Sequence, residues 1–210
     1  MEKKAVLIFG VGSLQKSLIL KCKRYGLYTI GIDPSPNATC RHNVDSFEVV
    51  DGNDFQKTLE VARKYNISGL ITTATDKPLL MMARVAEKIN LPFFSSQCAI
   101  ISTDKHLMKQ TFREANVPCP KSSLISCPND LIELDYPIIL KPRDNSGSRG
   151  VIKCNTYLEA LKNIEEVKLY TKHTSILAEE YIEGKEFSVE ALHYNGLNNV
   201  IQITEKITTP

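Results

Sequence analysis

The chain has 210 residues, of which 42% are hydrophobic and 24% charged, a composition typical of globular proteins and not of disordered or fibrous ones. Its 26 lysines and arginines nearly balance 24 aspartates and glutamates, and a net charge of +2 gives no sign of a nucleic-acid or lipid-surface binder. No apolar run approaches the about 18 residues of a membrane span, and no cleavage site follows the N-terminus, so we expect a cytoplasmic protein.

The first hundred residues alternate between strand and helix patterns. Residues 5–9 form a continuous apolar run, as expected for a parallel strand that is covered on both faces. Further strands are predicted at 28–32, 46–50, 67–72 and 91–94, and helices at 13–25, 55–65 and 78–89. We expect Ser13 to cap the first helix and Leu14, Leu18 and Cys22 to share its inner face. Repeated strand–helix units predict a parallel, doubly wound sheet.

From about residue 103 the pattern changes. Residues 104–115 form an amphipathic helix, and the proline-bearing segment after it indicates a linker. Strands are then predicted at 122–125, 138–141, 151–154, 176–182, 187–193 and 200–206, with one helix whose capping box is Thr156 and Glu159. Because these strands are mostly connected directly, the second half is predicted to be α+β.

The six cysteines are scattered and form no CxxC pair; they are Cys22, Cys40, Cys98, Cys119, Cys127 and Cys154. We interpret them as structural thiols in a reducing compartment and not as a disulfide framework or a metal site.

A glycine-rich turn follows the first strand. Gly10, Gly12 and Gln15 stand where a dinucleotide fingerprint has its three glycines, and Asp33 ends the next strand, where a ribose-binding acid would fall. Gln15 departs from the fingerprint, because the third glycine normally lets the helix pack closely on the strand. Three interpretations stay open: NAD or FAD binding, a tight turn without a ligand, or a turn whose amides meet another ligand at the helix N-terminus.

A second motif combines a lysine at the end of an apolar strand with a loop of small residues. Burying Lys141 is costly unless an anion meets it, and Pro142 ends the strand directly behind it. The loop offers amides and one cation to phosphate oxygens; its residues are Ser146, Gly147, Ser148, Arg149 and Gly150. We interpret the motif as a polyphosphate clamp of a kind other than Walker A; a surface hairpin with a basic tip is the alternative.

A third stretch, residues 176–187, begins as an apolar strand and turns into acidic residues and a glycine. Glu179 and Glu186 could accept hydrogen bonds from an adenine amino group and a ribose hydroxyl. Taken without their context, glutamates in such a pattern are more often solvated surface charges.

The lysine-ended strand, the loop of small residues and the acidic stretch follow one another in the order found in the ATP-grasp carboxylate-amine ligases. The chain resembles particularly the biotin carboxylase, carbamoyl phosphate synthase and phosphoribosylglycinamide synthetase branches. The resemblance also includes the Thr103-Asp104-Lys105 segment and Met108-Lys109, and it covers essentially the whole chain. It implies a Rossmann-like parallel-sheet domain at 1–102, a linker at 103–120, the small α+β nucleotide-lid domain at 121–186, and at 187–210 the first hairpin of an incomplete C-terminal sheet.

The resemblance also implies a role for each matching residue. Lys105 would contact phosphate, and Lys141 would bridge the phosphates and the base edge. Residues 146–150 would form a mobile lid over the β and γ phosphates. Glu179 would accept from the adenine amino group, and Glu186 would hold the ribose. The adenine hinge would be Glu180, Tyr181 and Ile182. Candidate substrate residues are Gly12, Asp33 and Asp76, although Asp76 is explained more readily as a helix-start residue before Pro78.

The implied reaction is activation of a carboxylate by ATP to an acylphosphate, which an amine then attacks, with Mg²⁺ and lysines neutralising charge. The chain departs from the family in lacking positions for the later acidic magnesium ligands, so no metal ligand is assigned and the chain is expected to be inactive alone. The alternatives are a nucleotide-binding regulatory module without catalysis and, less well supported, an NAD-dependent oxidoreductase.

The predicted final hairpin has an apolar set at Phe187, Val189, Ala191, Ile201 and Ile203. Because a lone hairpin is marginally stable in water, we expect it to pair with another copy of the chain, forming a homodimer, or to pack on the linker helix.

Overall fold

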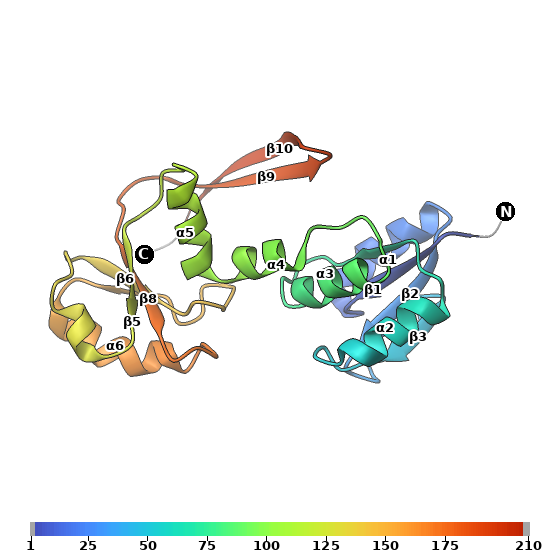
Figure 1. The fold of residues 1–210 in the computed structure, drawn as a ribbon, viewed down its shortest axis with the longest axis horizontal. Helices are drawn as coiled ribbons and strands as arrows, with labels where there is room; N and C mark the ends of the chain where they lie inside the picture. The colour runs from blue at the N-terminus through green and yellow to red at the C-terminus, as the bar shows by residue number, and fades with distance from the viewer. Residues whose placement is uncertain (1–2, 208–210) are drawn as a thin grey trace. The chain divides into compact units, whose positions relative to one another are not determined.

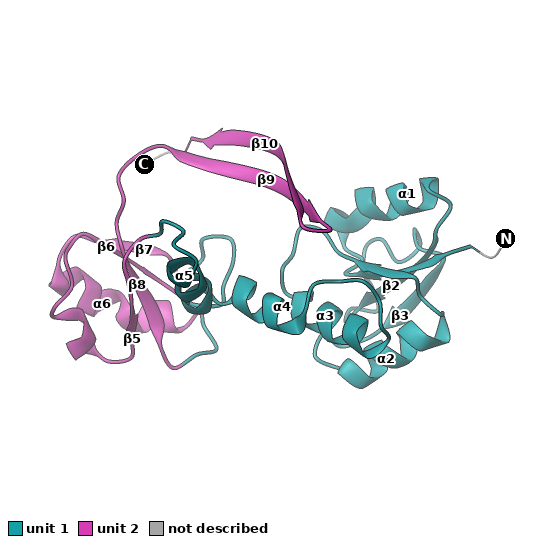
Figure 2. Ribbon diagram, turned by 45° about the horizontal axis from the view of Figure 1, so that its top comes forward, with its two compact units in different colours: residues 1–119, 143–149, 171–173 teal, residues 120–142, 150–170, 174–210 magenta. Residues whose placement is uncertain are grey.

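The computed structural model of the protein describes residues 3–207 and divides into two compact units, coloured separately in Figure 2. Unit 1 comprises residues 1–119, 143–149 and 171–173, and unit 2 comprises residues 120–142, 150–170 and 174–210. Over the described range, no helix has the length and apolar character needed to cross a membrane.

Unit 1 is built on a four-stranded parallel sheet (Figure 1). Its strands are β1 (Ala5–Phe9), β2 (Tyr28–Asp33), β3 (Ser46–Val49) and β4 (Gly69–Ile71), in the order β3-β2-β1-β4. All five residues of β1 are buried, which explains why its sequence is an unbroken apolar run.

Helices cover both faces of this sheet. On one face, Leu7 of β1 lies in a cluster with residues of α2 (Phe55–Lys64) and α3 (Leu79–Lys88). On the other, Ile8 lies in a cluster with residues of α1 (Lys16–Arg24). The predicted doubly wound α/β fold of the N-terminal half is therefore confirmed.

The entry into α1 differs from the prediction. A 3-10 turn, η1 (Ser13–Gln15), precedes α1, and Gly12 rather than Ser13 stands at its N-terminal boundary. Leu14 is 69% exposed, so the prediction that it faces inward was wrong, because the 3-10 turn shifts its direction relative to the following helix. At the other end of α1, Gly26 has a φ of +74°, as expected for a glycine that ends a helix.

The short strand predicted at 91–94 is not formed. The amide of Leu91 donates to the carbonyl of Ala86 at the end of α3, and Pro92 has no amide to offer a neighbouring strand. The chain instead enters α4 (Ser96–Thr103), which the sequence reasoning missed, and then α5 (Lys105–Glu114), which it predicted.

Unit 2 contains a four-stranded antiparallel sheet with α6 (Tyr157–Lys168) on one face. Its strands, in the order β5-β8-β6-β7, are β5 (Ser122–Ile125), β8 (Ile176–Glu180), β6 (Ile138–Lys141) and β7 (Ile152–Cys154), and a 3-10 turn, η2 (Pro128–Leu131), follows β5. Leu140 and Ala178 lie on the sheet face that α6 covers, and they belong to one buried cluster with Ile164 of this helix. The α+β prediction for the second half is confirmed.

A second sheet of unit 2 is the hairpin of β9 (Glu186–Tyr194) and β10 (Leu197–Lys206), in which every residue is exposed. Its turn, Asn195-Gly196, has positive φ at both residues, as a two-residue hairpin turn requires. A bulge between Val200 and Gln202 places Val200 opposite Ala191, so the apolar set includes Val200 where Ile201 was predicted.

Candidate functional site

The glycine-rich turn of unit 1 is closed by a glutamine side chain. Gln15 is only 7% exposed; its Oε1 accepts from the Gly12 amide at 3.1 Å, and its Nε2 donates to the Thr73 carbonyl at 2.7 Å. Gly10 has a φ of +84°, and a Cβ there would lie 3.5 Å from the Gln15 side chain. The Gln15 side chain thus occupies the turn at the position where a dinucleotide fingerprint has a glycine without a side chain.

Asp33 lies at the same edge of the sheet and is also engaged. Its Oδ2 accepts from the Val11 amide at 2.9 Å, and its Oδ1 accepts from the Ser35 amide at 2.9 Å. The amides of Val11 and Gly12 are therefore bonded to side chains of the chain itself. This arrangement favours a tight strand–helix turn over a pyrophosphate site and argues against NAD binding.

The other candidate substrate residue, Asp76, is exposed in the loop after β4, where its carbonyl accepts from the Leu79 amide at the start of α3. The carboxyl ends of β1, β2 and β4 bring Gly12, Asp33 and this loop to one edge of the sheet, and the bond from Gln15 to Thr73 joins two of these segments.

In unit 2, the sheet face opposite α6 carries a buried ion pair. Lys141 Nζ lies 2.6 Å from Glu179 Oε2, and the two side chains are 18% and 6% exposed. The strand register explains the contact: Ile139 stands opposite Glu179 and Lys141 stands opposite Leu177, so all four residues point away from the α6 face. Two of the predicted nucleotide residues thus meet on adjacent strands.

Lys153 lies on the same face and was missed by the sequence reasoning. It stands opposite Ile139 in the register of β6 and β7, and its Nζ lies 3.7 Å from the centroid of the Tyr181 ring. A signal for it exists in the sequence, since Lys153 is the polar residue between Ile152 and Cys154 in an alternating strand.

The predicted adenine hinge continues from β8. The Glu180 amide donates to the Lys121 carbonyl at 2.9 Å, and the Tyr181 amide donates to the Pro137 carbonyl at 3.3 Å. Ile182 is 62% exposed. Glu179 and Glu180 border a cavity of about 220 Å³, together with Lys121, Ser122, Ser123, Glu133, Leu134, Asp135, Ile138 and Ala178. Glu186, the predicted ribose residue, accepts from Lys206 Nζ at 2.7 Å at the base of the hairpin.

The predicted phosphate-binding residues of unit 1 lie together. Lys105 Nζ donates to the Asn145 carbonyl at 2.5 Å. Asn145 Oδ1 accepts from the Ser146 amide and from Arg149 Nη2, each at 3.0 Å. Gly147 and Ser148 both have positive φ, which gives the loop its tight curvature.

Gly150 is the last residue of the predicted lid and belongs to unit 2. Its φ is +72°, and a Cβ built there would lie 2.6 Å from Cδ2 of Tyr170. Both the backbone conformation and the close ring therefore require glycine at this position.

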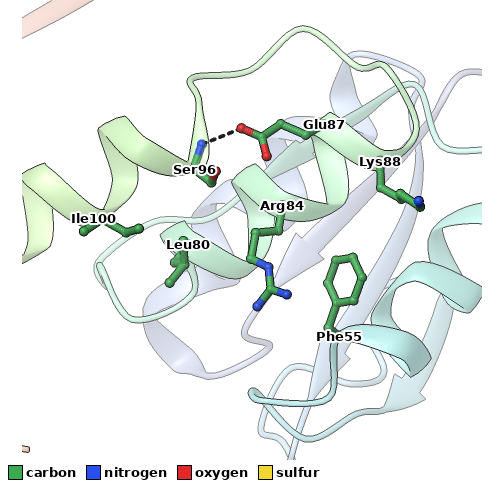
Figure 3. Close-up of a pocket in the computed structure, with 7 residues that line it drawn as sticks. All are labelled: Phe55, Leu80, Arg84, Glu87, Lys88, Ser96 and Ile100. Atoms are coloured by element: carbon green, nitrogen blue, oxygen red, sulfur yellow. Dashed lines mark hydrogen bonds between the residues drawn. The ribbon is translucent and has the colours of Figure 1, made fainter.

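A hollow of about 500 Å³ lies elsewhere in unit 1, between the start of α2 and helices α3 and α4 (Figure 3). The Arg84 guanidinium lies 4.7 Å from the centroid of the Phe55 ring, and Glu87 accepts from the Ser96 amide at 2.7 Å. None of the site residues predicted from the sequence lines it, so this hollow is separate from the candidate site.

Potential metal ligands and cysteines were located in the part of the chain that the structure describes. No group of three or more histidine, cysteine, aspartate or glutamate side chains there could hold a metal ion. The described residues therefore do not by themselves fit a Mg²⁺ site. Cys22, Cys40 and Cys154 are buried, and burial raises the pKa of the Cys22 and Cys154 thiols, which makes them less reactive.

Part of the chain matches a known protein family. Residues 134–210 match the family described as "ATP-grasp domain", a range that includes Lys141, Glu179 and Glu186. Over these residues the chain is similar to ATP-grasp domains, in agreement with the resemblance that its motifs indicated.

Among curated relatives, the chain is 24% identical over 160 residues to a carbamoyl-phosphate synthase of Methanobrevibacter smithii, covering 71% of this chain and 41% of the relative. It is 27% identical over 185 residues to a D-alanine–D-alanine ligase of Fervidobacterium nodosum, covering 78% and 56%. The chain therefore spans about half the length of the curated relatives that it matches.

Solved structures give the same fold. An N5-carboxyaminoimidazole ribonucleotide synthetase in complex with ADP matches with a TM-score of 0.84 and 19% identity, over 100% of this chain and 55% of that one. A phosphoribosylglycinamide synthetase from Anaerococcus prevotii matches with a TM-score of 0.70 and 26% identity, over 97% and 51%.

Proposed function

We propose that this chain is the ATP-binding part of an ATP-grasp ligase that activates a carboxylate as an acylphosphate for attack by an amine. The observation that carries the proposal is the Lys141–Glu179 pair, a cation and a carboxylate 2.6 Å apart on one sheet face. Both lie within the stretch that matches the ATP-grasp domain. A buried lysine beside a hydrogen-bond acceptor suits a ligand that carries phosphate and an amino group.

Each group has a proposed role. Lys141 contacts the phosphates, and Glu179 accepts from the adenine amino group. The backbone of residues 180–182 meets the adenine ring. Glu186 holds the ribose, which requires it to exchange its Lys206 partner for a hydroxyl. Lys105 and the 146–150 lid bind the β and γ phosphates.

Phosphoryl transfer needs charge neutralisation more than covalent participation by the protein. Lys105, Lys141 and Arg149 supply that positive charge from this chain. A magnesium ion would add to that charge, although the described residues offer no ligand set for it. Gly12, Asp33 and Asp76 at the edge of the parallel sheet are proposed to face a small carboxylate or amine substrate.

We also propose that the domain limits are 1–102, 103–120, 121–186 and 187–210, and that the protein acts in the cytoplasm.

The exposed apolar face of the β9–β10 hairpin supports pairing with a second copy of the chain, because isolated hairpins are marginally stable in water. Sedimentation velocity should then show a dimer, and a strictly monomeric protein with an ordered hairpin would contradict the pairing.

A thermal-shift titration tests the nucleotide proposal. Mg-ATP at a concentration about 100 times its Kd should stabilise the protein by about 2.7 kcal/mol, and NAD should not stabilise it. The shift should vanish in Lys141→Ala, measured against the melting temperature of that variant without ligand. Lys162→Ala, an exposed lysine on α6, should keep the full shift. Stabilisation by NAD and not by Mg-ATP would overturn the proposal.

A further inference from the structure

The loop of residues 143–149 is fastened to the start of α5 by an ion pair. Arg143 Nη2 lies 2.6 Å from Asp104 Oδ2, and Arg143 Nε lies 3.4 Å from Asp104 Oδ1. The two side chains are 15% and 9% exposed. The Lys105 amide also donates to the Arg143 carbonyl at 3.0 Å, so side chain and backbone both hold the first residue of the loop.

Asp104 serves two partners at once. Its Oδ1 accepts hydrogen bonds from the amides of His106 and Leu107 and thereby caps α5. Its two oxygens also accept hydrogen bonds from Nε and Nη2 of Arg143. Burial works against ionisation, yet the hydrogen bonds from Arg143 and from these amides hold the pKa of Asp104 below its usual range. The carboxylate therefore stays charged, and a two-pronged contact of this kind suits arginine and not lysine.

The contacts continue along the loop to the phosphate-binding residues. Lys105, next to Asp104, donates its ammonium to the Asn145 carbonyl, and the Asn145 side chain accepts from Ser146 and Arg149. The Arg149 Nε donates to the Ser146 carbonyl at 3.3 Å. A continuous series of hydrogen bonds thus leads from Asp104 to the cation at the tip of the loop.

Residues 171–173 hold the loop from a second side. Asp144 accepts from Thr171 Oγ1 at 2.5 Å and from the Lys172 amide at 3.3 Å, and His173 Nε2 lies 3.7 Å from Asp104 Oδ2. The loop is therefore held on two sides by contacts within unit 1, and a loop held in one conformation spares a ligand the entropy cost of ordering it.

We propose that Asp104 and Arg143 are positioning residues for the nucleotide phosphates: their ion pair sets the conformation of the 143–149 loop and so the placement of Ser146, Arg149 and Lys105. This rests on the proposed function. The pair itself touches no phosphate, and breaking it should weaken phosphate binding while leaving binding of the nucleoside part unchanged.

The test combines two measurements on Asp104→Asn, Arg143→Gln and the double variant. Asparagine keeps the helix cap but loses the charge, so α5 should stay intact. Amide hydrogen exchange in the ligand-free protein should speed up at residues 143–149 by about tenfold in all three variants. By calorimetry, Mg-ATP affinity should fall about tenfold in each, with no further loss in the double variant, because the two residues act as one unit.

Three controls separate this role from general damage. Adenosine affinity should stay within about twofold of wild type. Arg63→Gln, which removes an exposed cation from α2, should change neither exchange nor affinity. Arg143→Lys should restore only part of the affinity, since lysine cannot make the two-pronged contact.

Unchanged exchange at 143–149 in the variants would overturn the positioning role whether or not nucleotide binds. Faster exchange with unchanged Mg-ATP affinity would overturn it as well. A wild-type protein that binds no nucleotide, with exchange responding as expected, would instead overturn the proposed function and with it the assignment to phosphates.

Discussion

The ammonium of Lys141 lies 2.6 Å from the carboxylate of Glu179, across the adjacent strands β6 and β8. Both side chains are largely withdrawn from solvent, and desolvating two charges is costly unless the pair persists or a charged ligand joins it. The pair therefore links the stability of this sheet to its proposed ligand.

Removing one member of the pair should cost more than removing both. Lys141→Met should lower the free energy of unfolding by about 3 kcal/mol, because the Glu179 carboxylate loses its ammonium in a buried setting. The double variant Lys141→Met/Glu179→Gln should recover most of that loss. Urea denaturation of the wild type, both single variants and the double variant measures the coupling, with Lys153→Met as an exposed control; additive losses would contradict the coupling.

Gln15 should be a structural residue of the glycine turn. Gln15→Ala removes the partners of the Gly12 amide and the Thr73 carbonyl, so the free energy of unfolding should fall by about 2 kcal/mol. Leu14→Ala, at a neighbouring side chain that is 69% exposed, should cost under about 0.5 kcal/mol. Equal losses in urea denaturation would show that the Gln15 bonds do not hold the turn.

Stability should fall in mild acid because of His106. Its Nδ1 is buried and has no hydrogen-bond partner in the described part of the chain, and burial together with the charges of Arg143 and Arg113 lowers its pKa. Between that lowered pKa and the ordinary value near about 6.5, the unfolded chain binds a proton that the folded one does not, so stability rises with pH and levels off above it.

The free energy of unfolding should accordingly drop between about pH 7.5 and pH 5.5 in the wild type and stay flatter in His106→Gln. His42→Gln, at an exposed histidine, should behave like the wild type. The lowered pKa of Asp104 adds a separate loss only as the pH approaches the ordinary carboxyl range. An identical pH dependence of His106→Gln and the wild type would refute the assignment.

Gly150 should tolerate no side chain. Gly150→Ala meets both a positive φ and the Tyr170 ring, and should cost about 2 kcal/mol or more, whereas Gly147→Ala, with positive φ and open space, should cost about 1 kcal/mol. Thermal unfolding compares the two. Adding Tyr170→Ala to Gly150→Ala should recover part of the difference; no recovery would mean that the contact with Tyr170 is not the cause.

Much of the fold could be predicted because local patterns agree with it. The apolar run of β1 and the amphipathic pattern of residues 104–115 were visible in the sequence, and both elements lie where expected. The strand predicted at 91–94 failed because the Leu91 amide is used by the end of α3 and Pro92 has none. The bulge that replaces Ile201 by Val200 depends on strand register, which period-two alternation does not reveal.

The site could be predicted only residue by residue. Lys141 and Glu179 were each recognised from their motifs, but their contact depends on β8 inserting between β5 and β6, which sequence order does not show. The pairing of Asp104 with Arg143 spans 39 residues and had no sequence signal. Gln15 was recognised as a departure from a fingerprint, and only the structure explains what its side chain does.

We propose that this chain binds ATP at the sheet face that carries Lys141 and Glu179. Isothermal titration calorimetry of the 210-residue protein with Mg-ATP measures this binding. We expect a saturable single site that Lys141→Ala abolishes and Lys162→Ala leaves intact. The proposal would be wrong if a folded sample gave no binding heat and if Mg-ATP did not displace a fluorescent ATP analogue.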